Sequence, residues 1–174
     1  MIAVEEALAF VLENSFPLKE TEIIPINQCL NRNLAKAVEA PIDLPSFRLS
    51  SMDGYALRLH QSNTYSIVDE VKAGDTVNPS LKIGECVRIF TGAVVPDDSD
   101  AVIMQEKTIR KQDTITIETT VNKGQNIRLV GSQVKKGDFP LEKGQVLQAS
   151  GLAFLKSLGI DQVEVVRLPK VTIV

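Results

Sequence analysis

The stretch PSFRLSSMDGYALRLH, residues 45–60, marks the point where the sequence changes its periodicity. Upstream of it, apolar residues recur with the spacing of a surface helix, whereas from about residue 53 they alternate with polar residues. Alternation with a period of two is typical of β-strands. The same stretch carries a carboxylate, Asp53, on a glycine-backed turn just ahead of the first strand. The stretch therefore marks the start of a β-rich region. It also raises the question whether Asp53 only stabilises a turn or takes part in a reaction site.

Short runs between residues 55 and 121 favour a compact β-rich domain. Each run combines apolar and β-branched residues, and Gly, Pro, Asn or Asp separates it from the next. The runs are YALRL (55–59), YSIVDEV (65–71), GECVRIF (84–90), DAVIMQE (100–106) and DTITIETTV (113–121). Lys-Gly steps at 123–124, 136–137 and 143–144 are candidate turns. Strands at this spacing predict a barrel or sandwich, inserted as a domain over residues 46–146.

Helical periodicity precedes this domain. Residues 3–14 carry the apolar stripe of a surface helix, formed by Val4, Ala7, Leu8, Val11 and Leu12. Pro17 ends that helix, and Pro25 is a favourable first residue for a second one. The second helix is expected to run through INQCLNRNLA, residues 26–35, with one apolar face formed by Ile26, Cys29, Leu30 and Leu34.

A third helix and two strands are expected after the β-rich domain. Within residues 149–159, Ser150 is the expected N-cap and Gly159 the expected terminator. Residues 161–166 have the pattern of a strand. The run VTIV at 171–174 has the near-continuous apolar pattern of a strand buried on both faces of a parallel sheet. Because a chain seldom stops inside such a strand, we expect the sequence to be a piece of a longer protein.

Composition excludes several classes of protein. The 174 residues are 44% hydrophobic and 24% charged, which is an ordinary globular mixture. The net charge of −3, with acids and bases interspersed, gives no electrostatic case for a nucleic-acid or anionic-membrane surface. The apolar runs are too short to cross a bilayer, and the acidic start is unlike a secretory signal. Cys29 and Cys86 lack metal-site spacing, so a reduced, cytoplasmic protein is expected.

The first candidate site is SSMDGYA, residues 50–56. Asp53 offers carboxylate oxygens, Ser50 and Ser51 offer hydroxyls, and Gly54 permits a positive φ and the close approach of a ligand. The alternative is a turn in which Asp-Gly supplies backbone geometry alone, and the local sequence favours this alternative.

Two further segments carry polar groups. Thr91 and Gly92 follow a strand, where a hydroxyl and backbone N–H groups can face a ligand. The aspartates after them are interpreted as a solvated acidic loop, because they do not match a calcium loop: Asp97, Asp98 and Asp100. Arg128, close to Gly131, is a candidate phosphate or carboxylate ligand, although a solvated surface arginine is the commoner outcome.

Taken together and in order, these segments resemble the amino-terminal part of the MoeA family, to which the gephyrin E region belongs. The most specific matches are MDGYA at 52–56 and TGAVVPDDSDAVIMQE at 91–106. Further matches are APIDLPSF (40–47), GQNIRLVG (124–131), KKGD (135–138) and LKSLGIDQVEV (155–165). The resemblance runs from residue 2 to the last residue without a large gap.

The resemblance implies a multi-domain α/β homodimer that inserts molybdenum from molybdate into adenylylated molybdopterin, with Mg²⁺ and release of AMP. It assigns residues 17–45 and 147–168 to a small linking domain and 46–146 to the β-rich domain. The helix in residues 1–16 and the strand at 169–174 would belong to a pterin-binding α/β domain that the sequence lacks. This sequence by itself is therefore expected to be inactive.

The resemblance also implies the site. Asp53 and Thr91 match positions that line the family's active cleft, between the β-rich domain of one protomer and the pterin-binding domain of the other. They are the expected catalytic residues. Substrate-binding roles fall on the neighbouring positions Ser51, Gly54, Gly92 and Arg128, and this part of the chain is assigned no metal ligand.

The sequence departs from the family pattern at two places. Gly131-Ser132-Gln133 stands where the family usually reads Gly-Glu-Asp, and Gln133 cannot carry the negative charge that favours a cation. Arg48 and Leu49 replace an acidic or amide pair. A scaffold of the same fold without transferase activity, as in gephyrin's receptor clustering, therefore stands as the alternative function. A bare β-barrel binding module is a third.

Overall fold

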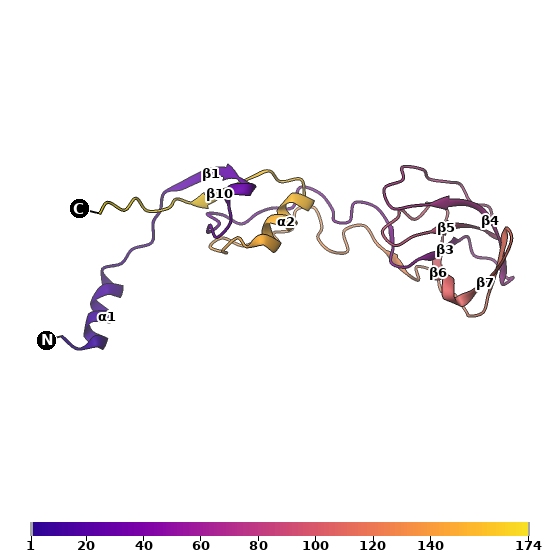
Figure 1. The fold of residues 1–174 in the computed structure, drawn as a ribbon, viewed down its shortest axis with the longest axis horizontal. Helices are drawn as coiled ribbons and strands as arrows, with labels where there is room; N and C mark the ends of the chain where they lie inside the picture. Colours follow the sequence, from indigo (N-terminus) through magenta and orange to yellow (C-terminus); the bar gives the residue numbers. More distant parts are fainter. Residues whose placement is uncertain (1, 174) are drawn as a thin grey trace. The chain divides into compact units, whose positions relative to one another are not determined.

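The computed structural model describes residues 2–173 and divides the chain into two compact units. Residues 42–136 form one unit, and residues 1–41 with 137–174 form the other. The first segments in chain order are α1 (Val4–Glu13), β1 (Thr21–Pro25), the 3₁₀ turn η1 (Ile26–Gln28), β2 (Leu49–Ser50), β3 (Gly54–Leu57), β4 (Thr64–Val71) and β5 (Glu85–Ile89). The remaining ones are β6 (Ala101–Met104), η2 (Gln105–Lys107), β7 (Thr108–Lys111), β8 (Thr114–Ile117), β9 (Ile127–Arg128), α2 (Ala149–Ser157) and β10 (Gln162–Val166) (Figure 1).

Unit 42–136 is built on a six-stranded sheet in the order β6-β3-β5-β4-β8-β7. The sheet curls as it crosses the unit (Figure 1). All its neighbouring strands are antiparallel except β4 and β5, which run parallel. Each of the five runs predicted between residues 55 and 121 contains one of these strands, so the predicted β-rich, barrel-like domain is confirmed.

Both faces of this sheet are buried. One face carries a cluster of small and branched side chains, namely Ala56, Val71, Leu81, Val87, Ile89, Ala93, Val95 and Val102. The other carries Tyr55, Leu57, Tyr65, Cys86, Ile103 and Ile115. Every residue of β3 is therefore buried. The double burial explains why this strand shows weak polar alternation, as a central strand covered on two sides should.

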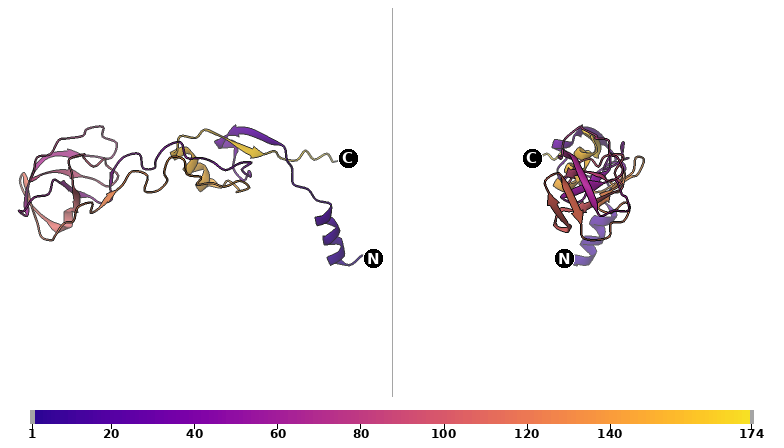
Figure 2. Two further views of the ribbon diagram at one scale, coloured as in Figure 1. Left: turned by 180° about the vertical axis from the view of Figure 1, so that it is seen from behind. Right: turned by 90° about the vertical axis from the view of Figure 1, so that its right-hand side faces the viewer.

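The other unit contains a two-stranded ladder that joins distant parts of the chain. β1 pairs antiparallel with β10, from Thr21 opposite Val166 to Pro25 opposite Gln162. The two strands lie side by side in Figures 1 and 2. The hydrophobic core of this unit consists of buried residues from β10 and from other segments, namely Cys29, Leu34, Leu141, Leu147, Leu155, Val163 and Val165.

The predicted helix over residues 26–35 is wrong. Residues 21–25 form β1, and only the short turn η1 follows. The backbone instead bonds to remote segments, because the N–H of Asn31 donates to Leu147 and that of Leu34 to Gln145. Asn31 also has a left-handed φ of 61°, which an α-helix does not accommodate. Of the predicted apolar face, Cys29 and Leu34 are fully buried although they lie in a loop, whereas Leu30 is 54% exposed.

The predicted third helix and the strand after it are confirmed as α2 and β10. Gly159 ends the helix as expected, with a φ of +74° and its N–H donating to Lys156. The N-cap was misassigned, since the cap residue is Gln148 and makes no side-chain cap hydrogen bond. Ser150 lies inside the first turn instead.

The two ends of the chain behave differently from each other. α1 forms close to its predicted bounds, and none of its residues is buried. Residues 169–173 do not form the expected buried strand, because they pair with no other described segment and Ile173 is 94% exposed. The last predicted strand residue, Val174, lies outside the described residues. Within residues 2–173, no helix has the length and apolar character needed to cross a membrane.

Candidate active site

Strand topology brings Asp53 and Thr91 together from positions 38 residues apart. Asp53 immediately precedes β3, and Thr91 lies two residues beyond the end of β5. The two strands are antiparallel, with Gly54 opposite Ile89. The start of β3 and the end of β5 therefore lie side by side at the same end of the ladder. Sequence order alone would not have placed the two side chains in contact.

The contact is a double hydrogen bond to one oxygen. Asp53 Oδ1 accepts the backbone N–H of Thr91 at 2.7 Å and the Thr91 hydroxyl at 2.7 Å. These two bonds, the backbone one first, hold the pKa of the Asp53 carboxyl below its ordinary value, and the positive charge of Arg88 acts in the same direction. Asp53 is therefore a carboxylate at neutral pH. Both residues are exposed, so the pair is open to a ligand.

This pair presents hydrogen-bond acceptors outward. Its two donors, the Thr91 hydroxyl and N–H, are already used on Asp53. Asp53 Oδ2 receives no hydrogen bond from any described residue. Ionised carboxylates only accept. The pair is thus suited to a cation, an N–H or O–H group, or a proton in transit, and not to an oxyanion.

The backbone around the pair is held on both sides. The carbonyl of Asp53 accepts the N–H of Gln105 at 3.1 Å. Gly92 adopts a φ of +83°, a conformation that favours glycine, and its N–H donates to Ser50. The turn that carries Thr91 is closed by the N–H of Ala93 donating to Phe90. Gly92 therefore shapes the turn and leaves its outer surface uncovered.

Gly54 has a different role from the expected one. Its φ lies outside the left-handed range, and it is the buried first residue of β3. A Cβ at this position would lie 1.8 Å from the carbonyl oxygen of Ile103 on the neighbouring β6. The glycine is needed because two backbones pass closely beside it. Its contribution to a site is indirect, through the path of the chain just after Asp53.

Ser51 directly follows β2, which bonds the Thr91 turn, and Arg128 lies on β9, which pairs with β2. The N–H of Ser51 donates to Asn126 at 3.0 Å. Arg128 belongs to β9 and lies opposite Leu49 of β2. Its side chain is exposed and makes no hydrogen bond or ion pair with the described residues. It is thus a cationic group without a hydrogen-bond partner among the described residues, and β2 lies between its strand and the segment that follows the Thr91 turn.

The acidic loop is less solvated than predicted. Asp98 accepts hydrogen bonds from the Ser80 hydroxyl at 2.8 Å and the Leu81 N–H at 3.1 Å, and pairs with Arg58 at 2.9 Å. Asp100 accepts from the N–H of Leu59 at 3.0 Å. These carboxylates therefore fasten loops to the sheet. Among residues 2–173, no cluster of three His, Cys, Asp or Glu side chains could hold a metal ion.

Of the departures from the family pattern, Arg48 has side-chain partners among the described residues, whereas Gln133 bonds through its backbone. Arg48 donates to the carbonyl oxygens of Pro96 at 2.6 Å and Ser99 at 3.2 Å. The N–H of Gln133 donates to Leu44. Arg48 thus secures the loop that follows the Thr91 turn.

Sequence reasoning missed Arg88 and Gln105. Arg88 lies opposite Tyr55 in the ladder, and its guanidinium bonds both the Gly54 carbonyl at 2.7 Å and the Gln105 side chain at 2.6 Å. The signal was available, because a charged residue inside the apolar strand VRIF is uncommon without a partner.

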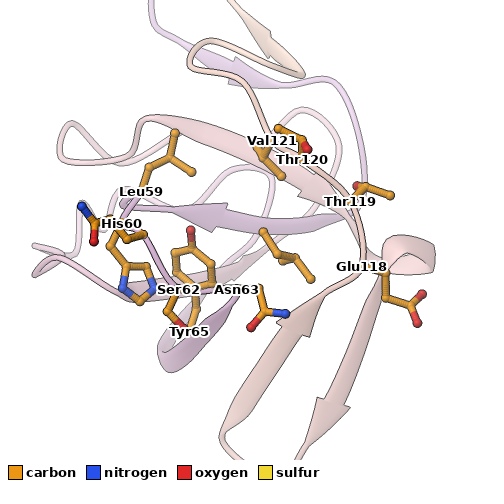
Figure 3. A pocket seen from close by; sticks show the side chains of 11 residues that line it. Leu59, His60, Ser62, Asn63, Tyr65, Glu118, Thr119, Thr120 and Val121 are labelled. Carbon is orange, nitrogen blue, oxygen red and sulfur yellow. The ribbon is translucent and has the colours of Figure 1, made fainter.

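A polar pocket of about 440 Å³ lies at the other end of β3. His60, Ser62 and Asn63 follow that strand, and the segment Glu118–Val121 lines the opposite wall (Figure 3). The His60 ring packs edge-on against Tyr65 at 4.6 Å between centroids. Because Asp53 precedes β3 and His60 follows it, this pocket is separate from the Asp53–Thr91 pair.

Comparison with known proteins decides the family. The family model of the MoeA N-terminal region (domain I and II) matches residues 2–159. The chain belongs to the MoeA family. This confirms the resemblance inferred from MDGYA and the TGA segment.

Solved and curated MoeA relatives agree with that assignment. A molybdopterin molybdenumtransferase of Haemophilus influenzae is 41% identical over 98% of this chain, and one of Staphylococcus aureus is 33% identical over 99%. The chain spans 43% of the length of each. A crystal structure of the molybdopterin biosynthesis MoeA protein from Pyrococcus horikoshii superposes with a TM-score of 0.84 at 34% identity, covering 95% of this chain and 46% of that one.

Proposed function

We propose that this chain contributes one half of the active site of a molybdopterin molybdenumtransferase. The reaction is insertion of molybdenum from molybdate into adenylylated molybdopterin, with release of AMP. The observation that carries the proposal is the Asp53–Thr91 pair, an ionised, exposed carboxylate built on a MoeA-family fold. The other half of the site would come from a pterin-binding domain outside this sequence.

Asp53 is the group we expect to act in the chemistry. Its free Oδ2 can accept a proton or supply one oxygen to Mg²⁺, a cation that prefers oxygen ligands and keeps several waters. One carboxylate does not make a magnesium site, so the remaining ligands would come from water, substrate phosphate and the other domain. Thr91 holds Asp53 in its ionised, oriented form.

The oxyanions of the substrates need donors that the pair does not offer. Arg128 carries a free guanidinium on the neighbouring β9 and is our candidate for a phosphate or molybdate oxygen. Ser51 supplies a nearby hydroxyl, and the open outer surface of Gly92 permits close approach of a ligand. The proposed roles of Ser51 and Gly92 rest on their positions in the chain next to Asp53 and Thr91, and that of Arg128 on the pairing of β9 with β2, the strand that precedes Asp53.

The exposed helix α1 supports a larger assembly. Its predicted apolar stripe is uncovered, with Val4 78%, Leu8 57%, Val11 57% and Leu12 66% exposed. Apolar stripes of this kind are normally buried against another element. We assign residues 1–16 and 169–174 to the pterin-binding domain, 17–45 with 147–168 to a linking domain, and 46–146 to the β-rich domain of a homodimer.

AMP release tests the proposal directly. A longer protein, made by joining this chain to the pterin-binding domain of a MoeA relative, is supplied with adenylylated molybdopterin, molybdate and Mg²⁺. Asp53→Asn should lower the rate by roughly 100-fold, the usual scale for loss of a positioned acid–base group. Asp113→Asn is the matched control, since this carboxylate lies in the β7–β8 turn, and it should leave the rate unchanged.

The isolated 174 residues should release no AMP. Turnover by them, or full activity of Asp53→Asn in the longer protein, would contradict the proposal. If the longer protein folds and binds molybdopterin but is inactive with Asp53 intact, the scaffold alternative is favoured.

A further inference from the structure

Arg88 connects the segments that surround Asp53. It projects from β5, three residues before Thr91, and its Nη1 donates to the carbonyl of Gly54 at 2.7 Å. Nη2 of the same guanidinium donates to the side chain of Gln105 at 2.6 Å. One head group therefore binds the residue that follows Asp53 and the residue that begins η2.

Gln105 in turn holds the backbone of Asp53. Its N–H donates to the Asp53 carbonyl at 3.1 Å. Asp53 is thus fixed by Thr91 on its side chain, by Gln105 on its own carbonyl and by Arg88 on the carbonyl that follows. Among the described side chains, Arg88 alone bonds both the Gly54 carbonyl and the Gln105 side chain.

The guanidinium itself is confined. Its central carbon lies 4.6 Å from the centre of the Phe90 ring and 5.3 Å from that of Tyr55. Stacking of this kind favours the planar head group of arginine, and the forked donors reach two acceptors in fixed directions. A lysine ammonium keeps the charge but cannot reproduce the fork.

We propose that Arg88 is a positioning residue, which keeps Asp53 within hydrogen-bond reach of Thr91 by bonding Gly54 and Gln105. The proposal rests on the function proposed above for the Asp53–Thr91 pair. It assigns Arg88 a role within the protein and no contact with substrate, since both of its Nη atoms donate to protein acceptors.

NMR spectroscopy of the 174-residue chain tests this inference without substrate. The measurements are the titration midpoint of the Asp53 carboxyl carbon and the exchange rate of the Thr91 amide. Arg88→Lys and Arg88→Gln should both raise the Asp53 midpoint and speed the exchange of the Thr91 amide about tenfold. The reason is that the charge-assisted hydrogen bond from the Thr91 N–H to the Asp53 carboxylate is weakened. Arg110→Lys, an exposed arginine on β7, is the control and should change neither.

A purely stabilising role predicts another result. The Arg88 variants would then lower the unfolding temperature while the Asp53 midpoint and the Thr91 amide stay unchanged, and this would overturn the inference. A change in Arg88→Gln with none in Arg88→Lys would also overturn it, because charge alone would then suffice. If both variants fail to fold, Gln105→Met tests the same connection, and unchanged values in it would reject the inference.

The outcome is separable from that of the proposed function. If Asp53→Asn leaves AMP release intact, the transferase site is wrong, yet the NMR result for Arg88 still stands or falls by itself. If the NMR result fails while Asp53→Asn is inactive, the site is retained and Arg88 is not its positioning residue.

Discussion

Asp53 Oδ1 accepts both the backbone N–H and the hydroxyl of Thr91, each at 2.7 Å. Because one residue supplies both donors, a substitution at Thr91 can remove the hydroxyl and leave the backbone bond. The pair therefore allows the two bonds to be weighed separately.

Thr91→Val should raise the titration midpoint of Asp53 only part of the way to that of an ordinary aspartate. The hydroxyl bond is lost, but the backbone N–H, the larger cause of the lowered pKa, remains. Thr91→Ser keeps a hydroxyl and should leave the midpoint near its original value. Carboxyl-carbon NMR measures both. A midpoint in Thr91→Val equal to that of the unaltered chain would show that the hydroxyl does not bond Asp53 in solution.

Gly54→Ala should destabilise unit 42–136 strongly. The new Cβ would lie 1.8 Å from a backbone oxygen of β6, so strands must separate, at a cost of roughly 3 kcal/mol in the free energy of unfolding. Gly151→Ala is a matched control inside α2, where the Cβ would make an ordinary 3.6 Å contact. That variant should stabilise by about 0.5–1 kcal/mol. Urea unfolding measures both, and equal effects of the two variants would contradict the predicted close approach.

Acid should weaken the attachment of the loop around Asp98. Hydrogen bonds from Ser80 and then Leu81 lower the pKa of Asp98 in the folded chain. A carboxyl whose pKa is lower in the folded chain stabilises the fold at pH values above its unfolded pKa of about 3.9. This stabilisation is lost as the pH falls through the pKa of the folded state. Asp98→Asn should therefore lower the unfolding temperature at pH 7 but not at pH 2. An equal loss at both pH values would mean that the charge of Asp98 plays no part.

Native cysteines should resist thiol reagents. Burial raises the pKa of the Cys86 thiol to about 12 and also raises that of Cys29. Since the thiolate is the reactive form, a disulfide reagent at pH 8 should label neither thiol until the chain is unfolded in urea, when both react. Rapid labelling of the native protein would contradict the buried positions of these side chains.

The sequence predicted much of the β-rich unit. Five of its strands follow from alternation and from turn residues between them, because strands such as β4 and β5 have apolar and β-branched side chains at regular intervals. Asp53 and Thr91 were singled out from motif order and the family resemblance, and the structure joins them by hydrogen bonds, while their catalytic role stays a prediction. The prediction failed where local pattern and remote bonding disagree. Residues 26–35 have a helical stripe, yet the N–H groups of Asn31 and Leu34 bond to the remote residues 147 and 145.

The site shows the same division at the level of single residues. The sequence alone shows that Asp53 is ionisable and that Gly54 is small, and it also indicates membership of the MoeA family. Tertiary structure decided that Gly54 relieves a clash with Ile103, that the Thr91 hydroxyl is used on Asp53, and that Arg88 bonds the segments around them. Side-chain chemistry and periodicity are local properties of the chain. The acceptor that a donor finds, and the backbone that passes beside a glycine, depend on strands paired across dozens of residues, and only the folded structure determines them.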